Sequence, residues 1–467
     1  MNRIVGLETE YGCLTSDPAG PAAAVARVRN WFFEQHRFGL ADLHQRDWDE
    51  PAGNGGFLFN GGRCYVDMGH LEICTPECLS LRDLLRFDRA GDAMLTAATH
   101  DLGLTDRVGF VRNNVDYYSG ATFGCHENYL VRRGAPLNEA NVQSLLAFLT
   151  LRVLYTGAGR VRASPGAEAR GDIVKLPMAE SDFQISQRAD YINNDLFEWV
   201  QFNRAIINTR DEPLADPRRF RRLHLLHGDT SVLPATLALK CGTTSLVLDL
   251  LEADKLPPVA LADAVYAFRA LSHQPEGPWR VPLADGREVS AVEVLRWFHV
   301  AAEQEFRGRD AETDTLLDAW SSVLTGLETN VEQLVGTVDW VTKRWLYTQF
   351  LAQENLPWTD PWLRAQDLEF HAVDPARNLA WPLARTPSPW EVSAVDQHAA
   401  LLTPPADTRA AARSRLMREL AREPVRCLVD WEVIEAEDCA ALMLLDPFDP
   451  APAGTDAWLR RVRATRA

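Results

Sequence analysis

The sequence lacks most of the short motifs that identify nucleotide-binding and hydrolytic enzymes. It has no GxxxxGK(S/T) phosphate loop, no GxGxxG motif after a strand, no GxSxG nucleophile motif and no HExxH zinc motif. No cysteines have the CxxC spacing, and Cys74 and Cys78 have no second pair to complete a zinc site. Any bound nucleotide must therefore be held without these devices.

Composition and charge restrict the possible partners. No apolar run approaches the length of a membrane span, and the first residues form a strand-like segment without a signal-peptide pattern. The net charge of −17 argues against general binding to nucleic acid, so we expect neither nucleic acid nor a membrane as partner. The eight cysteines are expected to be reduced, mostly buried thiols, which is typical of a cytoplasmic protein.

Strands and helices are mixed along the chain without regular βαβ alternation, which predicts an α+β fold with a mainly antiparallel sheet. A composition shift near residue 375 predicts a large domain at 1–375 and a small C-terminal domain at 400–467, with two strands near 425–445. Strands are expected near 1–14, 57–60, 63–68, 107–116 and 123–132, and helices near 21–36, 79–101, 138–156, 234–253 and 407–423.

Two strand-like segments, 3–12 and 63–72, carry an unusual density of carboxylates. Side chains two apart share a strand face, so Glu8 and Glu10 point the same way, as do Arg63, Tyr65 and Asp67. Such clusters form mainly where cations hold them together, and oxygen ligands suit Mg²⁺. A solvated acidic edge strand is the alternative, and further acids at Asp67, Glu72 and Glu77 count against it. The pattern points to nucleotide or acyl-phosphate chemistry.

Three other features allow two interpretations each. His126 is either a catalytic group or a hydrogen-bonded core histidine, with Glu127 on the opposite face of its strand. Arg210, within NTRDEP at 208–213, is either a phosphate clamp or part of a turn held by an internal ion pair. The basic run 218–222 is either a solvated helix face or a site for an acidic peptide.

Six segments together resemble the Pup ligase and Pup deamidase/depupylase family, in order along the chain from residue 2 to about residue 450. This resemblance implies a glutamine synthetase-like fold, in which a curved, mainly antiparallel sheet packed by helices cradles ATP beside a small C-terminal domain. The segments are GLETEYG at 6–12, NGGRCYVD at 60–67, GCHENYL at 124–130, SQR at 186–188, NTRDEP at 208–213 and RRLH at 221–224.

The resemblance also implies an activity and partners. A ligase of this family uses ATP to phosphorylate the terminal Glu side chain of a small, disordered Pup-like modifier. A lysine of a target protein then displaces the phosphate of the γ-glutamyl phosphate and leaves an isopeptide bond. The related hydrolase deamidates a terminal Gln or cleaves the isopeptide on the same scaffold.

Site residues follow from the resemblance, position by position. Glu8, Tyr65 and Glu72 are expected to bind Mg²⁺, with Glu10 in the same cluster. Asp67 is expected to be the base that accepts the proton of the incoming lysine, which is charged and not nucleophilic near its solution pKa. Contacts with ATP are expected from Arg63, Thr75 and Trp431, and Arg210 offsets charge on the transferring phosphoryl group.

Features of both branches of the family occur in this chain. The short segment between the first two strands, Thr75 and the Asp446–Phe448 segment resemble the ligase. The Trp48–Glu50 motif and the spacing from Asp67 to Glu72 resemble the hydrolase, and Leu71 replaces the usual proline, which suggests a divergent clade with its own Pup-like modifier. We expect a ligase; the alternatives are the deamidase/depupylase and an inactive protein that only binds the modifier.

Overall fold

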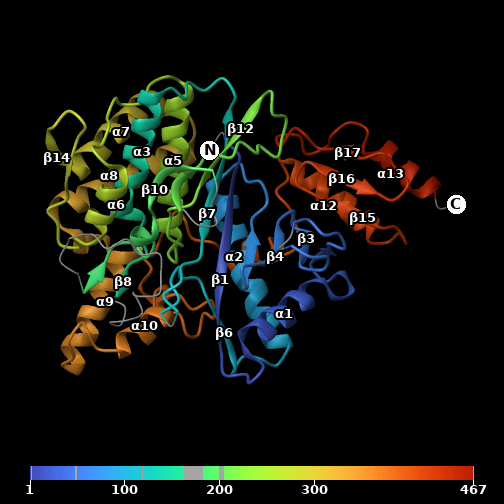
Figure 1. The fold of residues 1–467 in the computed structure, drawn as a ribbon, viewed down its shortest axis with the longest axis horizontal. Helices are drawn as coiled ribbons and strands as arrows, with labels where there is room; N and C mark the ends of the chain where they lie inside the picture. The colour runs from blue at the N-terminus through green and yellow to red at the C-terminus, as the bar shows by residue number, and fades with distance from the viewer. Residues whose placement is uncertain (2, 48–49, 118, 162–181, 199–203, 466–467) are drawn as a thin grey trace.

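The computed structural model describes residues 1, 3–47, 50–117, 119–161, 182–198 and 204–465. Trp48 and Asp49 of the expected hydrolase-like motif lie outside the described residues. Within them, a ten-stranded sheet runs through the centre of the molecule (Figure 1). Its path is β10 (Asn194–Phe197), β11 (Ala205–Asn208), β12 (Phe220–Leu225), β7 (Cys125–Arg132), β1 (Val5–Thr15), β5 (His70–Cys74), β4 (Arg63–Asp67), β3 (Gly55–Leu58) and β2 (Gly39–Ala41), and β6 (Val108–Val111) pairs with β1.

The sheet is antiparallel except for the parallel pair β10–β11. β1 is its central strand because it pairs with β5 on one side and with β7 on the other. A hairpin at Asn60 and Gly61 joins β3 to β4, the two strands expected near 57–60 and 63–68, and Gly61 has a φ of +91°, which favours glycine. The predicted fold class, α+β with a mainly antiparallel sheet, is confirmed.

One face of the sheet is covered by helices. Val5 and Leu7 of β1 and Tyr129 of β7 point into this core and are almost completely buried. The helices α2 (Leu81–Asp101), α3 (Glu139–Leu151) and α5 (Pro234–Glu252) contribute to the same core. The side chains between these apolar positions, Glu8 among them, point to the opposite face and leave it for polar chemistry.

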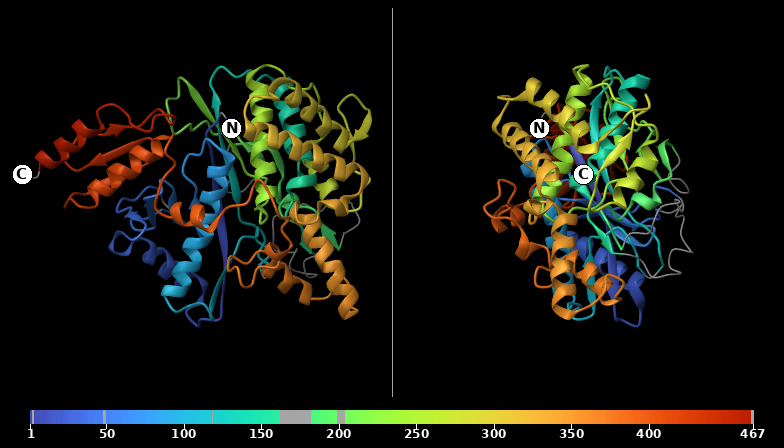
Figure 2. Two further views of the ribbon diagram at one scale, coloured as in Figure 1. Left: turned by 180° about the vertical axis from the view of Figure 1, so that it is seen from behind. Right: turned by 90° about the vertical axis from the view of Figure 1, so that its left-hand side faces the viewer.

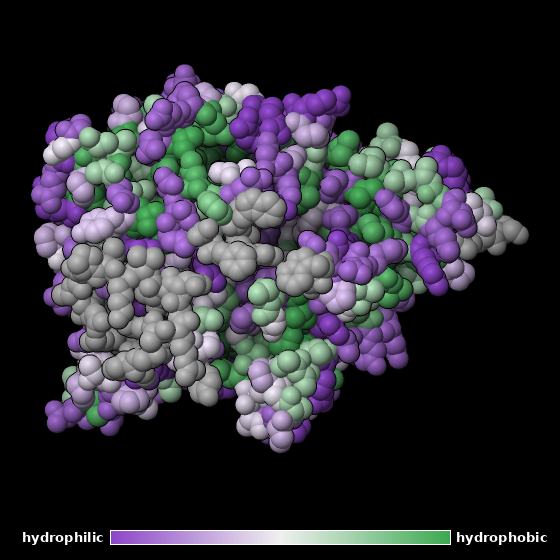
Figure 3. Space-filling view, viewed as in Figure 1, coloured by the Kyte–Doolittle hydropathy of each residue, from purple (hydrophilic) through white to green (hydrophobic). Residues whose placement is uncertain are grey.

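The remaining helices extend the molecule on both sides of the sheet (Figures 1 and 2). No helix among the described residues combines the length and the apolar character of a membrane span. Hydrophilic side chains spread over the face seen in Figure 3. These remaining helices are α1 (Gly20–Phe33), α4 (Val153–Thr156), α6 (Ala264–Ser272), α7 (Ala291–Phe306), α8 (Ala311–Thr329), α9 (Asp339–Glu354), α10 (Trp362–Phe370) and α11 (Ala394–Ala399). Short 3₁₀ turns lie at Glu34–His36, Ala189–Tyr191, Val331–Leu334 and Trp381–Leu383. Two small antiparallel sheets pair β8 (Arg160–Val161) with β9 (Phe183–Gln184) and β13 (Arg280–Pro282) with β14 (Glu288–Ser290).

A small C-terminal unit projects from one end of the large sheet (Figures 1 and 2). Its core joins Leu416, Ile434 and Trp458 to Phe57 and Phe59 of the large part, so the two parts share packed surface. The unit has three strands where the sequence predicted two, because the third has only two residues and leaves no pattern. It contains α12 (Arg409–Leu420), β15 (Cys427–Val429), β16 (Val433–Ala436), β17 (Leu442–Met443) and α13 (Thr455–Ala464). The domain limits at 375 and 400 stay a prediction.

Two further expectations have clear outcomes. The eight cysteines all lie in the described residues, none forms a disulfide, and five of them are buried, which confirms the expected thiols. The basic run 218–222 does not form a helix: Arg221 and Arg222 belong to β12, which pairs with β7. Neither Arg221 nor Arg222 therefore lies on the solvated helix face that was one interpretation of this run.

Candidate functional site

Antiparallel pairing brings the polar residues of β1, β4 and β5 together on the open face of the sheet. Glu8 lies opposite Cys74 and Glu10 opposite Glu72 on β5, while Glu72 lies opposite Tyr65 on β4. Residues directly opposite each other point to the same face. The register therefore gathers these carboxylates on one face. The segment 63–72, which was expected to be one strand, forms the hairpin of β4 and β5, and this pairing brings Glu72 to the face that carries Tyr65.

The first cluster contains Glu10, Asp67 and Glu72, whose nearest carboxylate oxygens all lie within 4.8 Å of one another. The hydroxyl of Tyr65 donates a 2.5 Å hydrogen bond to Oε1 of Glu72. Burial, followed by repulsion from Glu8, Glu10 and Asp67, raises the pKa of Glu72 well above its ordinary value. A bound cation would relieve this repulsion, so the donor set fits a divalent ion that prefers oxygen ligands.

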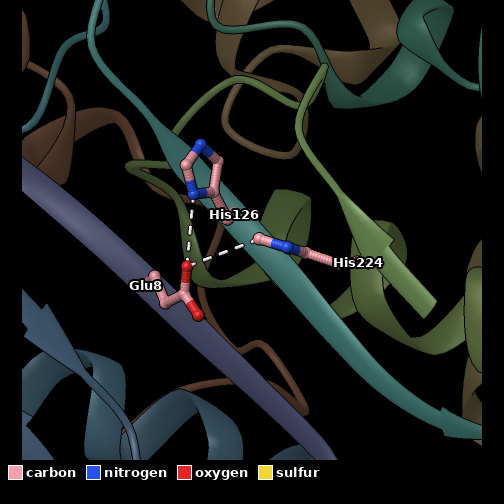
Figure 4. Close-up of side chains that lie close together, drawn as sticks. All are labelled: Glu8, His126 and His224. Atoms are coloured by element: carbon pink, nitrogen blue, oxygen red, sulfur yellow. Dashed lines mark hydrogen bonds and ion pairs between the residues drawn. The ribbon is translucent and has the colours of Figure 1, made fainter. Parts of the chain in front are cut away.

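A second cluster joins Glu8 to two histidines that point at its carboxylate from β7 and β12 (Figure 4). Nδ1 of His126 is 3.2 Å and Nε2 of His224 is 3.5 Å from Oε2 of Glu8. Burial lowers the pKa of His224 to about 4, so its imidazole is neutral near pH 7 and offers a lone pair. Burial would raise the pKa of Glu8, but the two histidines outweigh it and lower that pKa well below its ordinary value.

Neighbouring amides hold the second cluster in place. Nδ2 of Asn128 donates a 2.9 Å hydrogen bond to Oε1 of Glu8, which leaves Oε2 directed at the histidines. Nδ1 of His224 is 3.5 Å from Nδ2 of Asn208. Outer contacts of this kind orient ligating side chains. One carboxylate and two imidazole nitrogens are a suitable donor set for a second cation.

The layer beneath the site is stabilised by a buried ion pair. Glu127 points away from the open face, as its alternation with His126 predicted, and accepts hydrogen bonds of 2.6 and 2.9 Å from Arg152. The hydroxyl of Tyr129 donates a 2.6 Å hydrogen bond to Glu127, and all three side chains are completely buried. Burial would raise the pKa of Glu127, but the charge of Arg152 lowers it to about 2. This network fixes the strand that carries His126 and Asn128.

A pocket of about 630 Å³ opens beside the two clusters, between the large sheet and the C-terminal unit. Of the residues predicted to contact a nucleotide, Arg63, Thr75, Arg210 and Trp431 all line it, together with Glu8 and Tyr65. Asp67, Glu10 and Glu72 lie just beyond this lining, on the same strands. The hydroxyl oxygen of Thr75 accepts a 3.0 Å hydrogen bond from the amide of Leu7, so Thr75 also ties the pocket wall to β1.

Arg210 fits both interpretations of the NTRDEP segment. Its guanidinium donates to Oε1 of Glu212 at 2.5 and 3.2 Å, which is the expected internal ion pair. Oε2 of Glu212 accepts a 3.0 Å hydrogen bond from Arg222, which lines the pocket too. Two arginines thus face the pocket around one carboxylate.

Trp431 is held in the pocket wall by a buried junction between the two parts of the molecule. Glu77, which follows β5, accepts hydrogen bonds from Arg409 and Arg413 of α12 at 2.6 to 2.9 Å. Arg413 also donates a 3.0 Å hydrogen bond to the carbonyl oxygen of Trp431, and its guanidinium lies 4.9 Å from the centre of the indole ring. Docking of the C-terminal unit and the position of Trp431 are therefore linked.

Sequence reasoning missed part of this site. It named His126 as a catalytic candidate and His224 only within a motif, because nothing local indicates that both meet Glu8. It also missed the pairing of Glu50 with Arg63 and of Glu212 with Arg222. The polar alternation of HEN at 126–128 was the one available signal, since it places His126 and Asn128 on one strand face.

The comparisons with known proteins agree across nearly the whole chain. The family model described as Pup-ligase protein matches residues 3–435. A depupylase of Acidothermus cellulolyticus is 35% identical, covering 96% of this chain and 94% of the relative. A Pup–protein ligase of Kineococcus radiotolerans is 34% identical, covering 96% of each.

Solved structures give the same result. The ligase PafA in complex with the prokaryotic ubiquitin-like protein Pup has a TM-score of 0.83 and 30% identity, covering 99% of this chain and 93% of that one. PafA in complex with ADP has a TM-score of 0.78 and 30% identity, covering 89% of this chain and 92% of that one.

Proposed function

Because the chain belongs to the Pup ligase family, we propose that it is an ATP-dependent ligase that joins the terminal Glu side chain of a Pup-like modifier to lysines of target proteins. The observation that carries the proposal is the open sheet face, where two ligand clusters lie beside a pocket that is lined by arginines and Trp431. A disordered modifier and lysine-bearing proteins are the partners that this reaction requires.

The two clusters support a pair of cation sites for Mg²⁺. Glu10 and Glu72 are buried and would hold one ion with Tyr65 beside them, because a cation there would offset the mutual repulsion of the buried carboxylates. Glu8, His126 and His224 would hold the other. The predicted ligand set of Glu8, Tyr65, Glu72 and Glu10 is thus divided between two neighbouring positions.

The nucleotide would lie along the pocket with its phosphates toward the clusters. Trp431 offers an aromatic face for the base, and Arg63, Arg210 and Arg222 offer guanidinium groups for phosphate oxygens. Thr75 contributes a hydroxyl to the same lining. The proposal thus keeps the predicted nucleotide contacts Arg63, Thr75, Arg210 and Trp431 and adds Arg222 to them.

Asp67 carries the proton chemistry of the proposed reaction. It is half-buried, whereas Glu10 and Glu72 are buried, so Asp67 is the carboxylate of the first cluster that an incoming lysine can reach. Asp67 accepts a proton from the lysine ammonium, and the neutral amine then attacks the acyl carbon and expels phosphate. Bound Mg²⁺ supplies charge neutralisation for the phosphoryl group, and Arg210 adds to it.

The deamidase/depupylase reaction is the second candidate, favoured by the depupylase among the relatives. There Asp67 would act on water or on the amide and no ATP would be consumed, because amide hydrolysis is favourable by itself. Counting ADP formed per conjugate separates the two. The ligase forms one ADP for each isopeptide bond; conjugate cleavage without ADP formation would overturn the ligase assignment.

A further inference from the structure

Glu50 forms an ion pair with one of the pocket arginines. Oε2 of Glu50 accepts a 2.6 Å hydrogen bond from Nη2 of Arg63, and the two side chains are 23% and 12% exposed. The guanidinium of Arg63 also lies 4.2 Å from the centre of the Tyr65 ring. Burial alone would lower the pKa of Arg63, but the Glu50 carboxylate raises it. The pair is therefore a short, partly desolvated one.

The contact uses only part of the binding capacity of Arg63. The hydrogen bond runs through Nη2, while Nε of Arg63 is buried without a hydrogen-bond partner among the described residues. A phosphate group has enough oxygens to accept from both nitrogens of this fork. Exchange of the carboxylate for a phosphate would therefore satisfy a donor that Glu50 leaves unpaired.

We infer that Glu50 is an internal competitor of nucleotide phosphate for Arg63 and so weakens the affinity of the protein for nucleotide. This inference rests on the proposed function, because it takes Arg63 to be a phosphate ligand. A carboxylate and a phosphate cannot both accept hydrogen bonds from the same edge of the guanidinium.

Two other roles for Glu50 predict the opposite effect. Glu50 could accept a hydrogen bond from a ribose hydroxyl of the nucleotide, or it could hold Arg63 in the geometry that phosphate needs. In both cases, loss of the carboxylate weakens nucleotide binding. The sign of the change in affinity therefore decides between competition and assistance, and a damaged fold cannot imitate a gain in affinity.

The test measures the dissociation constant for ADP by calorimetry, without modifier or added metal, for the wild type, Glu50→Gln and Glu50→Ala. We expect ADP to bind about threefold to tenfold more tightly to both variants. In an Arg63→Gln background, Glu50→Gln should have no effect, since the competition acts through Arg63. Glu328→Gln is the matched control, because it breaks the Arg296–Glu328 pair on α7 and α8 and leaves the pocket lining intact.

Each outcome has a definite meaning. Tighter binding that disappears with Arg63→Gln supports the inference. Unchanged or weaker binding by both Glu50 variants, with normal wild-type binding, overturns it and leaves the proposed function standing. A wild type that binds no ADP overturns the nucleotide site itself, and the inference with it.

Discussion

The amide nitrogen of Gly124 donates a 2.8 Å hydrogen bond to Oε1 of Glu10. A β-carbon at Gly124 would lie 2.7 Å from that oxygen and 2.5 Å from Nε2 of His126. Real β-carbons do not approach other atoms so closely, so a side chain here displaces groups of both clusters. The absence of a side chain at this position therefore shapes the site.

Gly124→Ala should lower turnover by about 10- to 100-fold, because small displacements of catalytic groups are costly. Gly134→Ala is the matched control, since a β-carbon there meets nothing within 4 Å. Steady-state rates and thermal unfolding of both variants are the measurements. Equal activity of the two variants would show that the packing of Gly124 against Glu10 has no part in catalysis.

Asp67→Asn should bind nucleotide normally and lose turnover by about 10²- to 10⁴-fold, the usual contribution of a general base. An amide cannot accept the lysine proton but preserves the shape of the side chain. Nucleotide binding by calorimetry and conjugate formation by gel electrophoresis check the two halves of the prediction. Turnover close to that of the wild type would remove Asp67 from the mechanism.

Glu8→Gln should raise the Mg²⁺ concentration needed for half-maximal activity by about tenfold or more and weaken nucleotide binding. The amide loses the charge that the cation needs, while Asn128 can still contact the side chain. His224→Ala should shift the Mg²⁺ titration in the same direction, because it belongs to the same cluster. An unchanged titration in both variants moves the metal site elsewhere.

The buried pair Glu127–Arg152 predicts a pH-dependent contribution to stability. The pKa of Glu127 falls from an ordinary 4.5 to about 2 in the folded protein. Because the folded pKa is the lower one, the stabilisation is complete above pH 4.5 and is lost as the pH falls toward 2. The difference corresponds to about 3 kcal/mol.

Urea unfolding of the wild type and Glu127→Gln over a series of pH values measures this contribution. The variant should be about 3 to 5 kcal/mol less stable near neutral pH, because it leaves Arg152 without its charge partner. The gap should narrow as the pH falls below 4.5. A gap that does not depend on pH would contradict the assignment to Glu127.

The sequence predicted one half of the site and left the other half open, for a physical reason. Alternation within 3–12 placed Glu8 and Glu10 on one face of their strand, and alternation within 63–72 placed Arg63, Tyr65 and Asp67 on one face of theirs, since the strand period is a local property. The meeting of Glu8 with His126 and His224 depends on the pairing of β1 with β7 and of β7 with β12. Such long-range register is not written in a local pattern.

The misread basic run has the same origin. Four arginines around Phe220 have no strand propensity of their own, yet β12 forms because it extends the sheet beside β7. The ion pairs of Glu50 with Arg63 and of Glu212 with Arg222 were likewise missed, because the loops that carry these carboxylates give no periodic signal. Strand faces could be predicted here; loop contacts and strand neighbours required the structure.

The direction of the reaction is the central claim, and one assay tests it. The purified protein, Mg-ATP and a modifier ending in Glu are incubated with a lysine-bearing protein in one reaction and with a preformed conjugate in another. The ligase assignment predicts that conjugates accumulate in the first reaction and that ADP forms with them. Disappearance of the conjugate in the second reaction, with none formed in the first, would contradict it.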